Sequence, residues 1–253
     1  MAVVTTPAII LSALRYSETS KIVRLATRDH GVQSAIAKGA LRPRSRFGAA
    51  LQLLSEGVAT LHVRDTRELH TLAAFDVGRV HIALAADLER YSAAMALAEF
   101  MLRFAPPDPH PESFDLLLEG LSALESAPPA LTAATGLRAL WQLVASLGFA
   151  PATDVCVRDG TPLPPDGPLA FSTRDGGALC AACASGADAT RLPAEGRAAL
   201  EAMLDPSLPM PALDDLHARA HRRLLARFIR FHLGDNAELP ALQFWERRTW
   251  EPA

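Results

Sequence analysis

Short apolar runs rich in β-branched residues alternate with turn residues along the first third of the chain. The runs lie at 8–14, 21–27, 32–37, 57–63 and 69–77. Clusters of Gly, Asp, Ser and Arg separate them, as expected for strands joined by tight connections. Five short strands of this spacing predict a small barrel and fit the oligonucleotide-binding (OB) fold, although an SH3-like barrel has the same pattern.

The hydrophobic period changes to that of a helix after residue 87. Apolar residues then recur at steps of three and four over 88–102 and mark one helical face. The same period predicts a second helix over 114–121 and a third over 137–147, which Gly148 follows as a C-terminal cap. A short helix near 194–204 and a long one over 213–233 complete the pattern.

These elements predict an α+β fold with two domains. Residues 1–80 would form a five-stranded OB-fold barrel. Residues 81–240 would form a mainly helical domain that carries a zinc-ribbon-like knuckle as an insertion at 150–192, and residues 241–253 a C-terminal tail.

Composition indicates a globular protein that buries a core. The chain has 253 residues, of which 49% are hydrophobic and 21% charged. No apolar run approaches the roughly 18–20 residues of a membrane span, and no secretory signal is visible at the N-terminus. We therefore expect a cytoplasmic protein without a membrane association. Three cysteines do not make a disulfide framework and indicate metal ligands or buried thiols.

Charge is distributed unevenly. Residues 1–80 carry 11 Lys and Arg against 6 Asp and Glu, a net of +5, whereas the remainder carries 14 against 22, a net of −8. The segment 38–48 concentrates four of these cations between Gly39, Pro43 and Gly48. Such a cluster favours contact with a phosphate backbone, the commonest biological polyanion, over the alternative of an ordinary solvated loop.

Several residues are candidates for this contact. The predicted phosphate-binding cations are Lys38, Arg42, Arg44 and Arg46, and Lys21 and Arg24 would extend the row if their strand faces the same side. Phe47 and Tyr16 are candidates for stacking on bases, with a place in the core as the alternative.

The last long helix predicts a second basic surface. Arg219, Arg223, Arg227 and Arg230 follow one another at steps of 4, 4 and 3. A neighbouring apolar stripe would dock on the core: Leu216, Ala220, Leu224, Phe228 and Phe231. The arginine stripe fits a second DNA contact or an acidic peptide, and a solvated helix face is the alternative.

A pair of knuckles holds all three cysteines. The knuckles are Cys156-Val-Arg-Asp159 and Cys180-Ala-Ala-Cys183, and 23 residues lie between Cys156 and Cys180. Two such turns present four ligands to one tetrahedral ion, so Cys156, Asp159, Cys180 and Cys183 are the predicted ligands of a structural zinc. A carboxylate is a harder ligand than a thiolate and would weaken the site. The alternative is a knuckle that folds without metal.

Catalytic patterns are lacking. His217 and His221 have a metal-capable i, i+4 spacing, but no third ligand accompanies them. There is no phosphate-cradling P-loop and no G-x-S-x-G. The sequence therefore favours a protein that is not an enzyme.

The order of these motifs resembles the RecO family of bacterial recombination mediators. The resemblance rests on Tyr16-Ser-Glu-Thr-Ser-Lys-Ile-Val, Ala37-Lys-Gly-Ala-Leu-Arg, Ser45-Arg-Phe-Gly and the knuckle, and it spans about residues 7–235. It implies an OB barrel followed by a helical domain with a zinc knuckle. Asp159 departs from the family's four-cysteine pattern, and some members lack the metal site.

The resemblance also implies a function. Members of the family bind single- and double-stranded DNA, anneal complementary strands and partner with RecR. They contact the single-stranded-DNA-binding protein, whose acidic, aromatic-ended C-terminal tail would suit the arginine stripe, and indirectly help to load RecA at the nucleoid. A different class of function is an adaptor whose barrel binds a protein, and a third interpretation is RNA binding through the same barrel.

Overall fold

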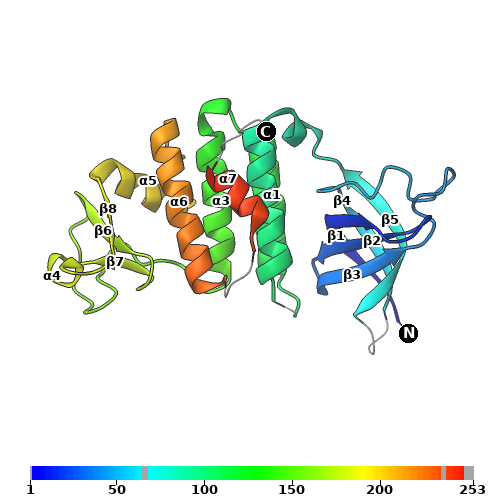
Figure 1. Ribbon diagram of the computed structural model, residues 1–253, viewed down its shortest axis with the longest axis horizontal. Helices are drawn as coiled ribbons and strands as arrows, with labels where there is room; N and C mark the ends of the chain where they lie inside the picture. Colours follow the sequence, from blue (N-terminus) through cyan, green and yellow to red (C-terminus); the bar gives the residue numbers. More distant parts are fainter. Residues whose placement is uncertain (1, 64–67, 107, 235–237, 248–253) are drawn as a thin grey trace. The chain divides into compact units, whose positions relative to one another are not determined.

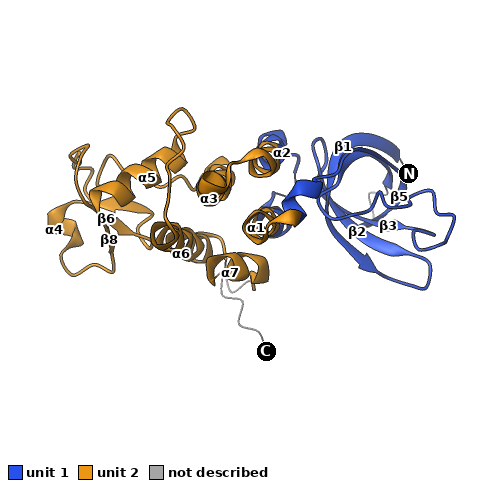
Figure 2. Cartoon of the chain, turned by 90° about the horizontal axis from the view of Figure 1, so that it is seen from above, with its two compact units in different colours: residues 1–85, 98–118 blue, residues 86–97, 119–253 orange. Residues whose placement is uncertain are grey.

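The five predicted strands form a closed barrel in the computed structural model (Figure 1). The structure describes residues 2–63, 68–106, 108–234 and 238–247. It divides into two compact units (Figure 2): residues 1–85 with 98–118, and residues 86–97 with 119–253. Each unit is described by itself.

The strand order in the barrel is β1-β2-β3-β5-β4. All neighbouring strands are antiparallel except β3 and β5, which pair in parallel. This order, closed by β1 against β4, confirms the predicted five-stranded barrel. The bounds of the strands are β1 Ala2–Arg15, β2 Lys21–Thr27, β3 Gly31–Ala37, β4 Glu56–Val63 and β5 Leu69–Arg79.

The first strand closes the barrel because it pairs with two partners. Its first half pairs with β4, from Ala2 to Ile9, and its second half with β2, from Ala8 to Arg15. The register shifts between Ile10 and Ser12, where a bulge bends the strand. Strand β1 begins six residues before the predicted run because Pro7 reads as a strand breaker.

Two helices contribute to the unit that holds the barrel. Residues 98–104 of α1 (Leu88–Phe104) and 111–118 of α2 (Pro111–Ser126) belong to it. Arg28 in the β2–β3 turn forms two hydrogen bonds of 2.9 and 2.8 Å with the carboxylate of Asp115. The unit is therefore larger than the strands alone.

The second unit is a helical bundle joined to a small sheet. The predicted third, short and long helices are confirmed as α3 (Thr132–Ser146), α5 (Ala194–Leu204) and α6 (Asp215–His232). Gly148 has φ +86° and follows α3 as predicted. Within the predicted tail, residues 240–247 form an additional helix, α7 (Pro240–Arg247), which packs on α6 and buries Trp245.

The predicted insertion holds a three-stranded antiparallel sheet in the order β7-β6-β8. Gly177 permits close packing here, because a Cβ at this position would lie 2.5 Å from the carbonyl oxygen of Ala152. Three short 3-10 or helical turns complete the fold. The remaining bounds are η1 Ile82–Ala86, η2 Pro129–Leu131, β6 Leu169–Ser172, β7 Gly177–Leu179, α4 Ala181–Ala184 and β8 Thr190–Leu192.

Among the described residues, none of the helices has the length and apolar character that crossing a membrane requires.

A buried ion pair connects three helices of the second unit. The guanidinium of Arg222 on α6 donates to Glu89 on α1 at 2.7 Å, and both side chains are at most 9% exposed. The indole Nε1 of Trp245 on α7 donates to the same carboxylate oxygen at 3.3 Å. Sequence periodicity gave no sign of this contact, because a charged residue reads as a surface position.

We predict that Glu89→Ala lowers the free energy of unfolding by about 3–5 kcal/mol, because it removes one member of a buried ion pair and keeps the other. The double change Glu89→Leu with Arg222→Leu should cost less than Glu89→Ala alone, since it removes both charges of the pair. Urea denaturation measures both values. A double variant less stable than Glu89→Ala would contradict this account.

Candidate nucleic-acid interface and metal centre

The basic segment is part of a loop, residues 38–55, that joins β3 to β4 and covers one end of the barrel. Phe47 and Leu51 are buried in the barrel core at 2% and 4% exposure. A series of turns holds the backbone, with Ser45 N–H donating to Arg42, Gly48 N–H to Ser45 and Ala50 N–H to Phe47. The loop is therefore anchored by its apolar side chains.

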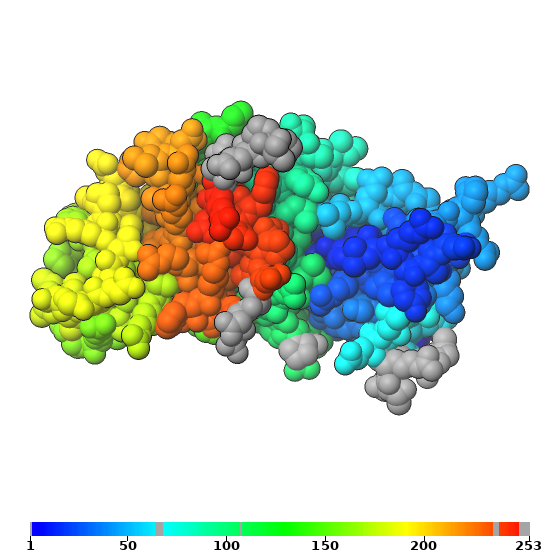
Figure 3. All heavy atoms as spheres, viewed as in Figure 1, coloured from blue at the N-terminus to red at the C-terminus, as the bar shows by residue number. Residues whose placement is uncertain are grey.

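The four predicted cations lie on the outside of this loop. Lys38, Arg42, Arg44 and Arg46 are all exposed, and the loop sequence contains no Asp or Glu. The nearest acid along the chain, Glu56, contacts His81. Figure 3 shows this part of the chain, in lighter blue, projecting from the barrel. Burial of the apolar residues thus leaves a projecting basic rim, the exposed residues Lys38, Arg42, Arg44 and Arg46, whose loop contains no acidic residue.

Lys21 and Arg24 have different surroundings. Lys21 pairs with Ala37, next to Lys38, and so lies at the strand end where the basic loop begins. Arg24 donates to the carbonyl oxygen of Leu102 at 3.2 Å, near the C-terminus of α1. Lys21 adjoins the loop, whereas Arg24 serves a helix end and does not continue the row of exposed cations.

The two aromatic candidates also separate. Tyr16 is 61% exposed in the β1–β2 turn, and this turn is tied to the basic loop because Leu41 N–H donates to the carbonyl oxygen of Thr19 at 3.0 Å. Phe47 is buried and cannot stack on a base, so its alternative role in the core is the correct one.

The arginine stripe on α6 is only partly available. Arg219 and Arg223 are exposed. Arg227 lies 3.6 Å from Asp188, and Arg230 is paired with Glu246 on α7. The freely exposed charge of the stripe is therefore concentrated at Arg219 and Arg223.

The predicted apolar stripe of this helix is wrong in part. Leu224 and Phe228 are buried, but Leu216, Ala220 and Phe231 are exposed. The buried face includes His221 and Arg222, polar residues that are not part of the predicted apolar stripe. The face is rotated because the buried ion pair, and not apolar character alone, decides which side meets the core.

The knuckle brings its four predicted ligands together. One ligand atom from each of Cys156, Asp159, Cys180 and Cys183 lies within 4.8 Å of the others. Asp159 Oδ2 lies 3.3 Å from the Cys180 sulfur and 3.2 Å from that of Cys183. The sulfur–oxygen edge of a tetrahedral zinc site is about 3.6 Å. The donor atoms thus have the chemical type of zinc ligands and lie close enough together that they could hold a metal ion.

The carboxylate is oriented by the loop itself. Asp159 Oδ1 accepts the Thr161 N–H at 3.0 Å, which leaves Oδ2 to face the thiols. The Thr161 N–H and the thiols hold the pKa of Asp159 well below its usual range. The Asp159 carboxylate, followed by Cys180, raises the pKa of the Cys183 thiol to about 12. Metal binding at such thiols requires their deprotonation and would release protons.

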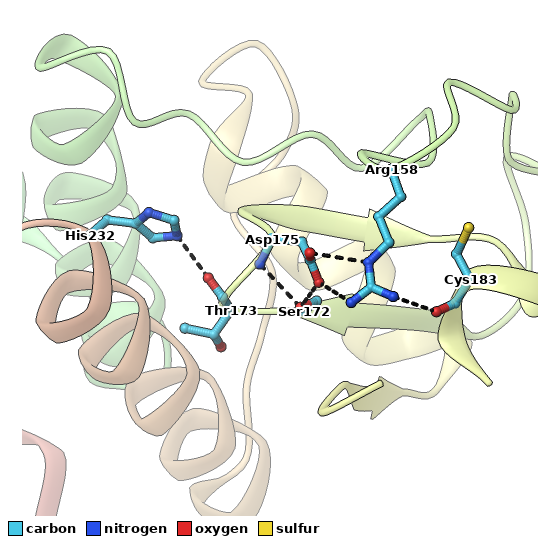
Figure 4. Close-up of polar contacts among 6 residues, drawn as sticks. All are labelled: Arg158, Ser172, Thr173, Asp175, Cys183 and His232. Carbon is cyan, nitrogen blue, oxygen red and sulfur yellow. Dashed lines mark hydrogen bonds and ion pairs between the residues drawn. The ribbon is translucent and has the colours of Figure 1, made fainter. Parts of the chain in front are cut away.

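A polar brace supports the centre from the side (Figure 4). Arg158, which lies inside the first knuckle, forms hydrogen bonds of 3.1 and 2.8 Å with Asp175 and donates to the carbonyl oxygen of Cys183 at 3.1 Å. Ser172 also donates to Asp175. Beyond this group, His232 on α6 contacts the carbonyl oxygen of Thr173 at 2.7 Å. The brace fixes both knuckles against the sheet.

Sequence reasoning missed this brace. Arg158 lies between two predicted ligands and is not itself of a metal-ligating type, and Asp175 lies in the β6–β7 turn. The position of Arg158 inside the knuckle was the only sequence signal for the brace. Arg158 and Asp175 are 17 positions apart in the chain, and a contact at that separation leaves no local periodicity.

Comparison with known proteins agrees with this architecture. A family model described as "Recombination protein O N terminal" matches residues 1–79, and one described as "Recombination protein O C terminal" matches residues 85–239. The chain belongs to the RecO family.

Curated relatives extend over most of the chain. A protein named DNA repair protein RecO from Anaeromyxobacter dehalogenans strain 2CP-C is 37% identical over 233 residues, covering 89% of this chain and 90% of its own length. One of the same name from Rubrobacter xylanophilus is 33% identical over 196 residues, covering 76% of each chain. RecO-family membership supports a role in DNA repair and recombination.

The two histidines of α6 in this RecO-family chain, His217 and His221, have different environments. His217 contacts Asp214 at the start of α6. His221 is 2% exposed, and burial, followed by the charge of His217, lowers its pKa to about 4. The two histidines do not form a metal site with any third ligand among the described residues.

We predict that His221 makes the folded state sensitive to acid. The folded state favours its neutral form, so stability is full above the unfolded pKa of about 6.5 and is lost as pH falls toward 4. The loss should be about 2 kcal/mol at pH 5. His221→Gln should reduce the difference between unfolding free energies at pH 7.5 and pH 5 by this amount. An unchanged difference in urea denaturation would refute the assignment.

Proposed function

We propose that this RecO-family chain is a non-enzymatic recombination mediator that binds single- and double-stranded DNA without reading its sequence. The observation that carries the proposal is the basic rim, four exposed cations on a loop anchored in the barrel core. A rim without acidic residues attracts any phosphate backbone, because the attraction depends on charge alone.

The same rim accounts for strand annealing. Two complementary strands repel each other through their phosphates, and cations that neutralise both reduce this repulsion. Pairing then needs no nucleophile and no bound nucleotide. Lys21 extends the rim at its strand end, and Tyr16 offers an exposed ring for stacking.

A second surface completes the proposal. Arg219 and Arg223 on α6 either contact DNA or receive the acidic C-terminal tail of the single-stranded-DNA-binding protein, since exposed cations suit both. Through such contacts the chain would act with RecR at the nucleoid to assist the loading of RecA.

We further propose that the knuckle holds a structural zinc ion. Cys156, Cys180, Cys183 and Asp159 would be its ligands, and four protein ligands leave no open position for a catalytic water. The ion would cross-link the two knuckle turns. Arg158 would orient them, and the bond from the Asp159 carboxylate would be the weakest of the four.

A second class of function is an adaptor whose barrel binds a protein partner. DNA titration separates the two, because a DNA complex that depends on the rim must weaken steeply with salt, whereas an adaptor would show no binding even at low salt. Competition between DNA and RNA of equal length tests the interpretation of an RNA-binding barrel.

We predict that replacing Arg42 and Arg44 with Ala weakens the binding of labelled single-stranded DNA at low salt. It should also reduce the slope of log affinity against log salt by up to about 1.4, because each lost phosphate contact removes about 0.7 from the slope. Fluorescence anisotropy at several salt concentrations measures both quantities.

The matched control is Arg28→Ala with Asp115→Ala, which removes an arginine whose charge is already balanced within the same unit. Its salt slope should equal that of the parent protein. An unchanged slope in the Arg42 and Arg44 variant, with binding intact, would remove the rim from the interface. Arg219→Ala with Arg223→Ala applies the same titration to α6.

We predict that the purified chain contains about one zinc ion, and that Cys180→Ser loses the ion and melts at a lower temperature. Asp159→Cys should retain zinc at higher chelator concentrations than the parent, because it completes a set of four thiolates. Elemental analysis and thermal unfolding are the measurements.

Ser185→Ala, an exposed change just beyond the second knuckle, should leave zinc content and melting temperature unchanged. If the parent protein holds no zinc while Cys180→Ser unfolds at the same temperature, the knuckle folds without metal and the zinc proposal fails.

A further inference from the structure

The barrel has few aromatic rings to offer to nucleobases. Residues 1–79 contain Tyr16, Phe47 and Phe75, and both phenylalanines are buried, at 2% and 6% exposure. Proteins that hold single strands through this kind of barrel usually stack bases on flat side chains. Tyr16 alone among these rings is exposed, so a second flat surface must come from another residue type.

Arg46 provides such a surface. Its guanidinium carbon lies over the ring of Phe47, 5.0 Å from the ring centroid. The guanidinium is planar, and nucleobases stack on guanidinium planes as they do on aromatic rings. One side of the Arg46 side chain is therefore turned to a buried ring, while the residue remains exposed to solvent.

The ring on which the Arg46 guanidinium lies is held firmly in place. Phe47 is held in the barrel core, its N–H donates to Ser45 Oγ at 3.2 Å, and its carbonyl oxygen accepts the Ala50 N–H at 2.7 Å. A cation held over an anchored ring loses less side-chain freedom on binding than a freely moving one. Arg44, two residues earlier, has no ring contact among the described residues and serves as the natural comparison.

We propose that Arg46 is a base-stacking residue, in which Phe47 supports the guanidinium from inside the barrel and an unpaired nucleobase stacks on its outer face. This deepens the proposed DNA binding and rests on it. The other three cations of the loop would contact phosphate only, so that Arg46 alone among them distinguishes a strand with bases from one without.

The test compares two oligonucleotides of equal length and charge, oligo(dT) and an abasic strand with the same phosphates. Arg46→Lys keeps the positive charge but removes the flat surface, and Arg44→Lys is the matched control. We expect Arg46→Lys to weaken oligo(dT) binding about fivefold or more, with little change for the abasic strand. Arg44→Lys should leave the ratio of the two affinities unchanged.

A second readout uses 2-aminopurine in place of one base, because its fluorescence is quenched on stacking. Quenching on binding should diminish in Arg46→Lys and persist in Arg44→Lys. Equal weakening of both strands by Arg46→Lys, or no effect on either, would overturn the stacking role. Failure of the parent protein to bind either strand at low salt would instead refute the proposed DNA binding, and equal melting temperatures of the three proteins show that folding is unaffected.

Discussion

Burial of the apolar side chains of the loop between β3 and β4 is the constraint on which the candidate interface depends. The barrel is closed along its strands, and at this end its core is covered by Phe47 and Leu51. These side chains can be buried at little cost, whereas an unpaired guanidinium cannot. The apolar residues therefore occupy the barrel, and the cations between them are left in solvent. The basic rim is thus a consequence of core packing. Near the end of the loop, Leu54 adopts a left-handed backbone conformation with φ +63°.

Several described arginines pair with carboxylates. Examples are Arg222–Glu89 and Arg230–Glu246 in the helical unit and Arg28–Asp115 in the barrel unit. On the barrel loop, no carboxylate neighbours the cations along the chain. A paired arginine holds helices together and adds little to the field outside the protein. Exposed positive charge that a polyanion could meet therefore remains on the loop and at Arg219 and Arg223 of α6, although the chain as a whole carries a formal charge of −3.

Much of this architecture follows from local patterns. Strand and helix periods located the barrel and most of the helices, because each element buries one face and so alternates in a regular way. The spacing of the knuckles located the cluster of four side chains that could hold a metal, since ligands of one ion recur at fixed spacings. The contacts that could not be predicted from the sequence are those in which a charged residue is buried. Arg222 has the character of a surface residue, yet it is buried, and the buried face of α6 therefore differs from the predicted apolar stripe. Arg24 likewise has the pattern of a DNA-binding cation, yet it binds a helix end.

The departure of Asp159 from an all-thiolate knuckle fits the rest of that region. A carboxylate bonds zinc less strongly than a thiolate, so a knuckle with this ligand needs support from the protein. Here one carboxylate oxygen accepts the Thr161 N–H and the other faces the sulfurs, which fixes the orientation before any metal binds. Arg158 holds the second knuckle through the carbonyl oxygen of Cys183 and is itself held by Asp175. The two knuckle turns are therefore positioned by hydrogen bonds. For this reason the four side chains can gather in the knuckle even though one of them is the more weakly binding carboxylate of Asp159.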